Sequence, residues 1–380
     1  MAFWGTYDLG KPRVRLLLEG ARRAGLEVLE CHGDLWSGIE DKSEISGLRR
    51  RLRFPLRWLA RLPGLVWRYL RLGDHDVVVV PYLGQFDVLA LWPWARLRRK
   101  PVYLDAFLSL YDTVVLDRRR LSAGSWAARA LWGLEWLACR AADRVFLDTA
   151  SHARAFEEMF RLAPGSVASV WVGAEDLFHR SAGRDRRGGD ADAALEVLFY
   201  GQFIPLHGID TIVEAAALLE AQGERVRWRI VGRGQEAPRI DARIRELGLR
   251  SIQREDWVSY EQLPAAIRQA DLCLGVFGRS GKASRVIPNK VFQILAAGRP
   301  LVTADTPGVR ELLEAGPAVE LVPPGSSEAL ARAVLDLGRR IRSTDRARAA
   351  VGAALKVDAA AVGAQLLRCL FPEVEEGKHD

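Results

Sequence analysis

Short apolar runs alternate with amphipathic stretches along most of the chain, and this alternation predicts a parallel β/α architecture. The runs are rich in Val, Leu, Ile and aromatic residues, and the segments between them have helical spacing. In the first half they are Ala2–Tyr7, Leu26–Cys31, Asp76–Tyr82, Pro101–Asp105, Arg144–Asp148 and Val167–Val172. In the second half they are Leu195–Gly201, Val226–Gly232, Ile252–Val258, Leu272–Phe277, Leu301–Ala304 and Val319–Val322. Such strands are typical of sheets with helices on both faces, so we predict an α/β fold of two doubly wound, Rossmann-like domains.

A polar, glycine-rich segment near the middle of the chain marks the domain boundary. His179–Ala194, HRSAGRDRRGGDADAA, has the composition of a linker. We predict an N-terminal domain over 1–178, a linker over 179–194, a second domain over 195–350 and a helical tail over 351–380, which is long enough to cross back to the first domain. Asp190-Ala-Asp192 forms a DxD, a metal-binding motif in one class of transferases, but no strand leads into it and we dismiss it.

The composition is that of a globular protein whose first half is basic. Of 380 residues, 49% are hydrophobic and 27% charged, and the net charge is +7. Residues 1–175 hold 26 Lys/Arg and 20 Asp/Glu, which accounts for +6 of it. The four cysteines are far apart, so we predict no zinc site, no disulfide framework and a reducing, cytoplasmic setting. We see neither a signal peptide before the first strand nor an uncharged apolar run of the ~20 residues that span a bilayer.

An arginine-rich segment at about 45–73 interrupts the first domain. It contains eight arginines between Arg49 and Arg71 and no acidic residue. Leucine and tryptophan side chains lie between the charges, and Pro55 and Pro63 predict a break into short helices. A basic amphipathic surface with tryptophan suits the interface of an anionic membrane. The alternatives are an ordinary solvated helix pair, or nucleic acid, for which we find no groove-reading element.

A second basic stretch, Gly281–Pro300 (GKASRVIPNKVFQILAAGRP), lies between two predicted strands. It reads as a loop, then a helix that begins at Pro288 and Asn289 and ends at Gly298. Lys282, Arg285 and Lys290 would then lie near a helix N-terminus at the carboxyl end of a strand. Parallel α/β proteins bind anions such as phosphate at this position, although a solvated basic loop has the same composition.

Other candidate ligand-binding residues follow the first-half strands. Gly5 ends the first strand and allows a close approach of the backbone to a ligand or to the next helix. Asp105 and Asp148 end strands of the same sheet, where ligands bind, but each has the alternative of a helix cap or turn. Asp148 leads into Thr149, Ser151 and His152, which we read as a capped helix start.

The second half of the chain resembles a known family. The segments GQFIPLHGIDTIVEAA, WRIVGRGQ, LPAAIRQADLCLGVF, PNKVFQILAAGRPLVT and PGVRELL, in this order, are similar to the donor domain of the family-4 glycosyltransferases of GT-B fold, the glycosyl transferases group 1. The resemblance covers about Leu195–Leu337. The first half resembles the matching acceptor domain more weakly, through GTYD, PRVR, YLDAF and VWVGAEDLF.

The resemblance implies two sheets facing a cleft and a hexosyltransferase-type transfer of sugar from a nucleotide sugar to a hydroxyl acceptor, with retention and without a metal or other cofactor. Our candidates for the donor diphosphate are Lys282, Arg285, His207, Gly208, Asn289 and Lys290. Those for the nucleoside are Gln293, Gly201, Phe203 and Gly232. On the acceptor side they are Gly5, Tyr7 and Arg13, with Asp105 orienting the acceptor hydroxyl, and the alternative for these acceptor-side residues is a turn, cap or surface position.

Four positions depart from the family pattern. The family usually has an arginine and a lysine in the loop where Gln202 and His207 stand here, and two glutamates where Arg285 and Gln293 stand. We expect Lys282 and Arg285 to replace the lost loop cations, because fixed positive charge is what a leaving diphosphate requires. The other interpretation is an inactive or repurposed copy.

The acceptor is expected to be a lipid-linked or membrane-proximal glycan, as in cell-surface polysaccharide assembly, with the protein cytoplasmic and peripheral on the inner face of the membrane. A soluble acceptor is the alternative. Two other functions stay open: a GT-B sugar-nucleotide epimerase or phosphorylase, or a non-catalytic GT-B-like protein that binds a membrane or a partner.

Overall fold

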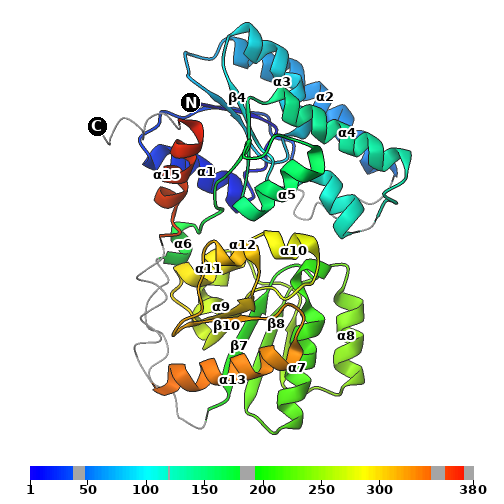
Figure 1. Ribbon diagram of the computed structural model, residues 1–380, viewed down its shortest axis with the longest axis vertical. Coiled ribbons are helices and arrows are strands. Elements are labelled where there is room, and N and C mark those ends of the chain that lie inside the picture. Colours follow the sequence, from blue (N-terminus) through cyan, green and yellow to red (C-terminus); the bar gives the residue numbers. More distant parts are fainter. Residues whose placement is uncertain (37–47, 119, 180–192, 344–355, 372–380) are drawn as a thin grey trace. The chain divides into compact units, whose positions relative to one another are not determined.

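The computed structural model describes residues 1–36, 48–118, 120–179, 193–343 and 356–371, with the backbone alone for residues 48–54. The chain divides into two compact units (Figure 1). The first comprises Met1–Val172 with Ala359–Asp380, and the second Gly173–Asp358. The first unit thus ends before the predicted boundary at residue 178, and the end of the chain belongs to it. Residues 180–192, with most of the predicted linker and its DxD, lie outside the described part.

The first unit is built on a six-stranded parallel sheet of order β2-β1-β3-β4-β5-β6. Its strands are β1 (Ala2–Gly5), β2 (Leu29–His32), β3 (Val78–Val80), β4 (Val102–Asp105), β5 (Arg144–Leu147) and β6 (Val167–Ser169). Successive side chains of one strand enter opposite cores, Phe3 on one face and Trp4 on the other. Both faces are therefore buried at the centre of the sheet, which is why β1 and β3 are continuously apolar.

Helices cover each face of this sheet. α1 (Pro12–Arg23) and α15 (Ala359–Leu370) pack on one face. The other face carries α2 (Leu48–Leu70), α3 (Gln85–Leu97), α4 (Trp126–Ala141) and α5 (Ala150–Phe160), and the π-helix η2 (Asp112–Asp117) precedes α4. α15 crosses α1 at Gly20 and Gly363, where a Cβ on either residue would overlap the backbone of the other helix. Glycine at both positions lets the end of the chain join the first core.

The second unit repeats the architecture with a six-stranded parallel sheet of order β12-β11-β10-β7-β8-β9. Its strands are β7 (Leu195–Tyr200), β8 (Val226–Val231), β9 (Ile252–Glu255), β10 (Leu272–Leu274), β11 (Leu301–Ala304) and β12 (Val319–Val322). Its helices are α6 (Asp176–His179), η3 (Pro205–His207), α7 (Ile209–Ala221), α8 (Ala237–Glu246), α9 (Leu263–Gln269), α10 (Gly281–Arg285), α11 (Asn289–Ala296), α12 (Pro307–Arg310) and α13 (Ser327–Ser343). The predicted fold of two doubly wound α/β domains is confirmed.

Two local predictions are wrong. α2 is one helix of 23 residues that contains Pro55 and Pro63, rather than a series of short helices. Both prolines lie on its exposed side, so water satisfies the carbonyls that lose their partners. The stretch after β10 is not a loop, because Gly281–Arg285 forms the short helix α10, capped by the Ser280 side chain. Among the described helices, none is both long and apolar enough to cross a membrane.

Candidate functional site

The candidate site of the second unit lies where β7 ends and α11 begins. β7 leads through Gly201 into the loop that contains Phe203 and η3, and Gly208 then starts α7. A Cβ on Gly232, which follows β8, would overlap the carbonyl oxygen of Gly201, and both glycines have φ near +146° (147° and 145°). The two strand ends can approach this closely only without side chains.

Lys290 is the central side chain of the site. It is 5% exposed, and its Nζ lies 3.8 Å from the centroid of the Phe199 ring. Within the described residues no hydrogen-bond partner reaches Nζ. A Cβ on Gly201 would lie 2.8 Å from this Nζ and 3.0 Å from Cε1 of His207, so the three residues form one cluster. We call Gly201, His207 and Lys290 the β7 cluster.

The β7 cluster combines two basic groups whose charged forms are disfavoured by burial. Burial lowers the pKa of Lys290 well below its usual value. The pKa of His207 is also lowered, first by burial and then by the charge of Lys290. Nδ1 of His207 is bonded to the carbonyl oxygen of Gln202, which orients the ring. An anion beside these groups would favour their charged forms, so the cluster is suited to a phosphate.

Gln293, on α11, is buried and belongs to a chain of hydrogen bonds that ends at the partly buried Tyr260 and Glu175. The Tyr200 hydroxyl donates to its Oε1 at 3.0 Å, and its Nε2 donates to the Tyr260 hydroxyl at 3.3 Å. Tyr260 in turn donates to Glu175. An amide serves both tyrosines here without burying a charge, which gives a local reason for glutamine where the family usually has glutamate.

α10 brings Lys282 and Arg285 beside the loop after β7. Ala283 of α10 packs on Leu206 of η3 in a small apolar cluster. Lys282 is buried and Arg285 half-buried, at the last position of α10. Asn289 is the first residue of α11, with Pro288 as its N-cap.

Phe203 is a buried structural residue, and its ring offers no exposed face on which a nucleobase could stack. Its side chain is fully buried, and the Arg254 guanidinium lies 4.2 Å from its ring centroid. Its backbone N–H donates to the carbonyl of Arg233 at 2.9 Å, which ties the loop after β7 to the loop after β8.

In the first unit the structure joins two acceptor-side candidates that are 92 residues apart. Arg13 donates to both carboxylate oxygens of Asp105, at 2.9 and 3.1 Å, and both side chains are buried. Arg13 also donates to the carbonyl oxygens of Val170 and Leu147. Asp105 thus holds Arg13, and it presents no exposed carboxylate oxygen in this structure.

The other two acceptor-side candidates are also engaged. Gly5 approaches the Asp87 carboxylate, which accepts from the backbone of Thr6 at 2.5 Å and from Trp58 Nε1 at 2.6 Å. Burial raises the pKa of Asp87. The Tyr7 hydroxyl donates to Glu30 of β2 at 3.3 Å, and burial raises the pKa of this tyrosine.

Sequence reasoning missed the partners that orient these residues. Tyr200, Tyr260 and Asp87 carry no motif, and their contacts join positions far apart in the chain. Tyr200 had one usable signal, since it is the last residue before the candidate Gly201 in the predicted strand Leu195–Gly201. Within the part of the chain that the structure describes, no group of three or more His, Cys, Asp or Glu is arranged to hold a metal ion.

Comparisons with solved structures identify the fold class. Anabaena HepE, solved in complex with UDP, aligns over 98% of this chain and 99% of its own, with a TM-score of 0.65 at 15% identity. Sucrose-phosphate synthase from Thermosynechococcus elongatus aligns over 99% of both chains, with a TM-score of 0.63 at 18% identity. The chain has the fold of the GT-B glycosyltransferases.

Comparisons of sequence then identify the family. Residues 194–339 match the model of the family described as glycosyl transferases group 1. The putative colanic acid biosynthesis glycosyl transferase WcaI of Escherichia coli is 33% identical over 137 residues, 35% of this chain and 33% of the relative. The alpha-D-kanosaminyltransferase of Streptomyces kanamyceticus is 28% identical over 251 residues, 61% of this chain and 59% of the relative. The second unit is similar to the glycosyl transferases group 1 over residues 194–339, which confirms the resemblance, while the match to WcaI spans about a third of its length.

Proposed function

We propose that this protein is a glycosyltransferase that moves a hexosyl-type sugar from a nucleoside diphosphate sugar to a hydroxyl acceptor. The observation that carries the proposal is the β7 cluster, a buried lysine amine and an imidazole at the carboxyl end of a strand and the start of an eight-residue helix. Amines that lose their solvation without gaining an anion are costly, so such a pair indicates a bound anion in the working state. The diphosphate of a nucleotide sugar is that anion in the family.

The donor would be held by groups of the second unit alone. Lys290, His207, Lys282 and Arg285 would supply positive charge to the diphosphate, and the backbone of Gly208 and the N-terminus of α11 at Asn289 would donate hydrogen bonds. Gln293, with its amide already oriented by two tyrosines, would contact the ribose, in the region of Gly201, Phe203 and Gly232. Relatives in fold are known with UDP, which makes a uridine nucleotide the first donor to test.

The proposed transfer is retaining and independent of metal. The bond between the anomeric carbon and the diphosphate oxygen breaks, the acceptor oxygen bonds to the same carbon, and the acceptor proton leaves to a phosphate oxygen. Residues of the β7 cluster would stabilise charge on the departing diphosphate, which is where a fixed cation lowers the barrier most. Gly5, Tyr7, Arg13 and Asp105 are the proposed acceptor-side residues, and the bidentate ion pair supports a role for Asp105 in orienting the acceptor through Arg13, which it holds in place.

Calorimetric titration with UDP, GDP, ADP and dTDP tests the donor site. Lys282→Ala/Arg285→Ala is expected to weaken binding of the preferred diphosphate by roughly tenfold or more, since hydrogen bonds to charged groups contribute about 1.5–3 kcal/mol. Lys356→Ala/Arg332→Ala, which removes two exposed cations of the same unit, is the matched control. Equal binding by both double variants and the parent would exclude the phosphate role of Lys282 and Arg285.

Release of nucleoside diphosphate from its sugar, with and without acceptor hydroxyls, separates an enzyme from a binding protein. Turnover that survives EDTA supports metal independence, and the anomeric configuration of the product by NMR tests retention. A protein that binds the diphosphate but turns over no donor would be the non-catalytic alternative.

We further propose a cytoplasmic protein that works peripherally at the membrane on a lipid-linked or membrane-proximal glycan, a proposal supported by the arginine-rich helix α2 and by relatives named for colanic acid biosynthesis.

A further inference from the structure

We propose that α2 and α3 form one membrane-docking surface, which enters the headgroup region of an anionic bilayer with α2 lying in the membrane plane. This inference rests on the membrane part of the proposed function and specifies the surface involved. α2 is long enough to show three separate stripes. Trp58, Leu62, Leu65, Val66 and Tyr69 form the stripe that packs toward the sheet. The other two stripes face water.

The first exposed stripe of α2 is apolar. Its residues are Leu56, Leu59, Pro63, Trp67 and Leu70, spaced three or four apart, so they share one side of the helix. Leu56 is 64% exposed and Trp67 55%. A helix of a globular protein normally places such residues inward, and α2 already has an inward apolar stripe. The second apolar stripe faces solvent and therefore does not contribute to the core.

The second exposed stripe of α2 is basic. Arg57, Arg61, Arg68 and Arg71 lie along one flank of the apolar stripe, and all four are exposed. No ion pair joins them to an acidic residue in the described ranges, and the Arg71 guanidinium lies 4.1 Å from the centroid of the Trp67 ring. α2 itself contains no acidic residue. Its charge is therefore complementary to lipid phosphates, which are anionic, and guanidinium groups bind phosphate well.

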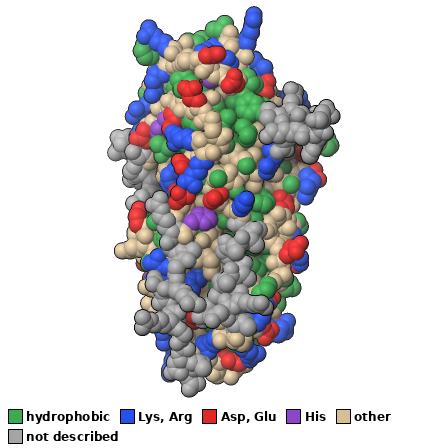
Figure 2. All heavy atoms as spheres, turned by 90° about the vertical axis from the view of Figure 1, so that its left-hand side faces the viewer, with side chains coloured by type: hydrophobic (Ala, Val, Ile, Leu, Met, Phe, Trp, Pro, Cys, Tyr) green, Lys and Arg blue, Asp and Glu red, His purple; other side chains and the backbone are tan. Residues whose placement is uncertain are grey.

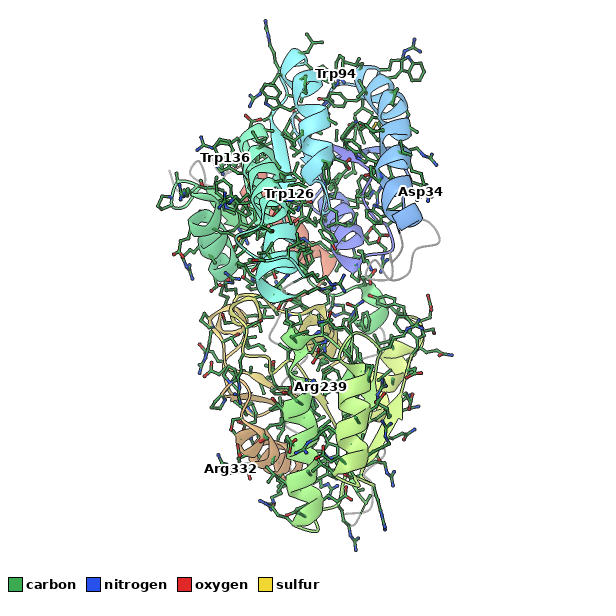
Figure 3. The ribbon with its side chains drawn as sticks, turned by 90° about the vertical axis from the view of Figure 1, so that its right-hand side faces the viewer. Asp34, Trp94, Trp126, Trp136, Arg239 and Arg332 are labelled. Carbon is green, nitrogen blue, oxygen red and sulfur yellow. The ribbon has the colours of Figure 1, made fainter. Side chains whose placement is uncertain are left out.

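α3 extends the apolar surface in a way that the arginine pattern did not predict. Phe86, Trp94 and Leu97 are exposed on it, Leu97 at 71%, and the only acidic residue of α3 is the buried Asp87. The Phe86 ring contacts Trp58 of α2 at a centroid distance of 5.8 Å, so the two helices are direct neighbours. α2, α3 and α4 lie side by side in Figure 3, which labels Trp94 near the end of α3.

This concentration of apolar side chains sets the α2/α3 surface apart. Of the fourteen exposed large hydrophobic side chains in the described residues, α2 and α3 supply eight. The face of the first unit that carries α15 shows acidic and basic side chains intermixed (Figure 2). Apolar residues with tryptophan, flanked by arginines and lacking exposed acids, are the combination that interfacial helices use. A protein partner would have to supply both an apolar groove and acidic flanks, whereas an anionic bilayer offers an apolar interior and phosphate groups together.

Sedimentation of the full chain with vesicles of phosphatidylglycerol and phosphatidylcholine tests the proposal. The parent is expected to bind the anionic vesicles and to lose binding at high salt. Arg57→Gln/Arg61→Gln is expected to weaken the partition roughly 30-fold, because each basic residue near an anionic surface contributes about fivefold. Arg245→Gln/Arg332→Gln, which removes two exposed arginines of the second unit, should bind as the parent does.

A second pair of variants tests the contribution of the exposed apolar side chains of α2 and α3 to membrane binding. Trp67→Ser/Leu97→Ser, with one change on each helix, should weaken binding at least about tenfold, and Trp257→Ser, at an exposed tryptophan of the second unit, should not. Each variant is checked for UDP binding, which reports the donor site and not the membrane surface. Equal binding of parent and variants, or of neutral and anionic vesicles, overturns the inference. Concentration-dependent self-association that Trp67→Ser/Leu97→Ser abolishes would instead assign the surface to a second copy of the chain.

Discussion

Replacing Lys290 with methionine should stabilise the empty protein and weaken its binding of nucleoside diphosphate. Methionine has similar length and keeps a favourable contact with the Phe199 ring, where Nζ now lies 3.8 Å from the centroid. The change removes an amine that is buried without a hydrogen-bond partner among the described residues. Leaving such a group unsatisfied costs about 1–3 kcal/mol. A gain of that size raises the melting temperature of a unit of this length by about 2–4 °C per kcal/mol.

The same substitution should show a characteristic pH dependence. The folded pKa of Lys290 is lowered, so between that value and the unfolded pKa of roughly 10.4 the unfolded chain binds a proton that the folded chain does not. The parent therefore gains stability as pH rises through this interval. Lys290→Met lacks this gain, so its advantage in melting temperature should be larger at pH 7 than at pH 9.5. His207, whose pKa is also lowered, adds a rise in stability up to about pH 6.5 in both proteins.

Lys290→Met should stabilise the empty protein but weaken its affinity for nucleoside diphosphate. A diphosphate beside the β7 cluster favours the charged amine, so Lys290→Met should bind it roughly 10–150-fold more weakly, the equivalent of a charged hydrogen bond of about 1.5–3 kcal/mol. Calorimetry in buffers of different ionisation enthalpy should show proton uptake by the parent that is reduced in the variant. Lys356→Met, at an exposed lysine of the same unit, is the control. A Lys290→Met protein that melts lower and binds UDP normally would refute the assignment, because Lys290 would then be structural.

Three further substitutions test the scaffold by thermal unfolding. Gly363→Val should cost about 1–3 kcal/mol, because the new side chain overlaps the backbone of α1, whereas Ala364→Val at the exposed neighbour should change stability by less than about 0.5 kcal/mol. Asp105→Asn should cost about 3–5 kcal/mol by leaving Arg13 buried without its anion, and a loss below 1 kcal/mol would contradict a structural ion pair. Gln293→Glu buries a carboxyl whose pKa should rise, so this variant should lose stability between pH 5 and 8 relative to the parent, and a flat difference would show that the site is solvated.

The strands could be predicted from the sequence because their signal is local. All twelve expected strands are present, and most are one to three residues shorter than their apolar runs. A strand buried on both faces must be apolar at every position, so it stands out without knowledge of its neighbours. The helix of Gln293 and Lys290 could be located for the same reason, from the proline at its start and the glycine after its end.

Helix continuity depended on packing that no local rule contains. Pro55 and Pro63 predict breaks, yet α2 continues through both, because Leu65 and Tyr69 are fully buried against the sheet and the prolines face water. The low helix propensity of single residues is a weak predictor of where a helix breaks when that helix buries a long apolar stripe. The exposed apolar surface shared with α3 was hidden for the same reason, since sequence alone does not say which of two apolar stripes points inward.

By itself the sequence determined the α/β class, the two sheets and the resemblance of the second unit to the glycosyl transferases group 1. Only the tertiary structure decided which of its polar residues meet. It joined Arg13 to Asp105 and Tyr200 to Gln293, and it put Lys290 beside His207 where both side chains are buried. Periodicity reports burial along one element, whereas the charge state of a side chain depends on the groups around it in space. Those groups come from positions dozens of residues away in the chain.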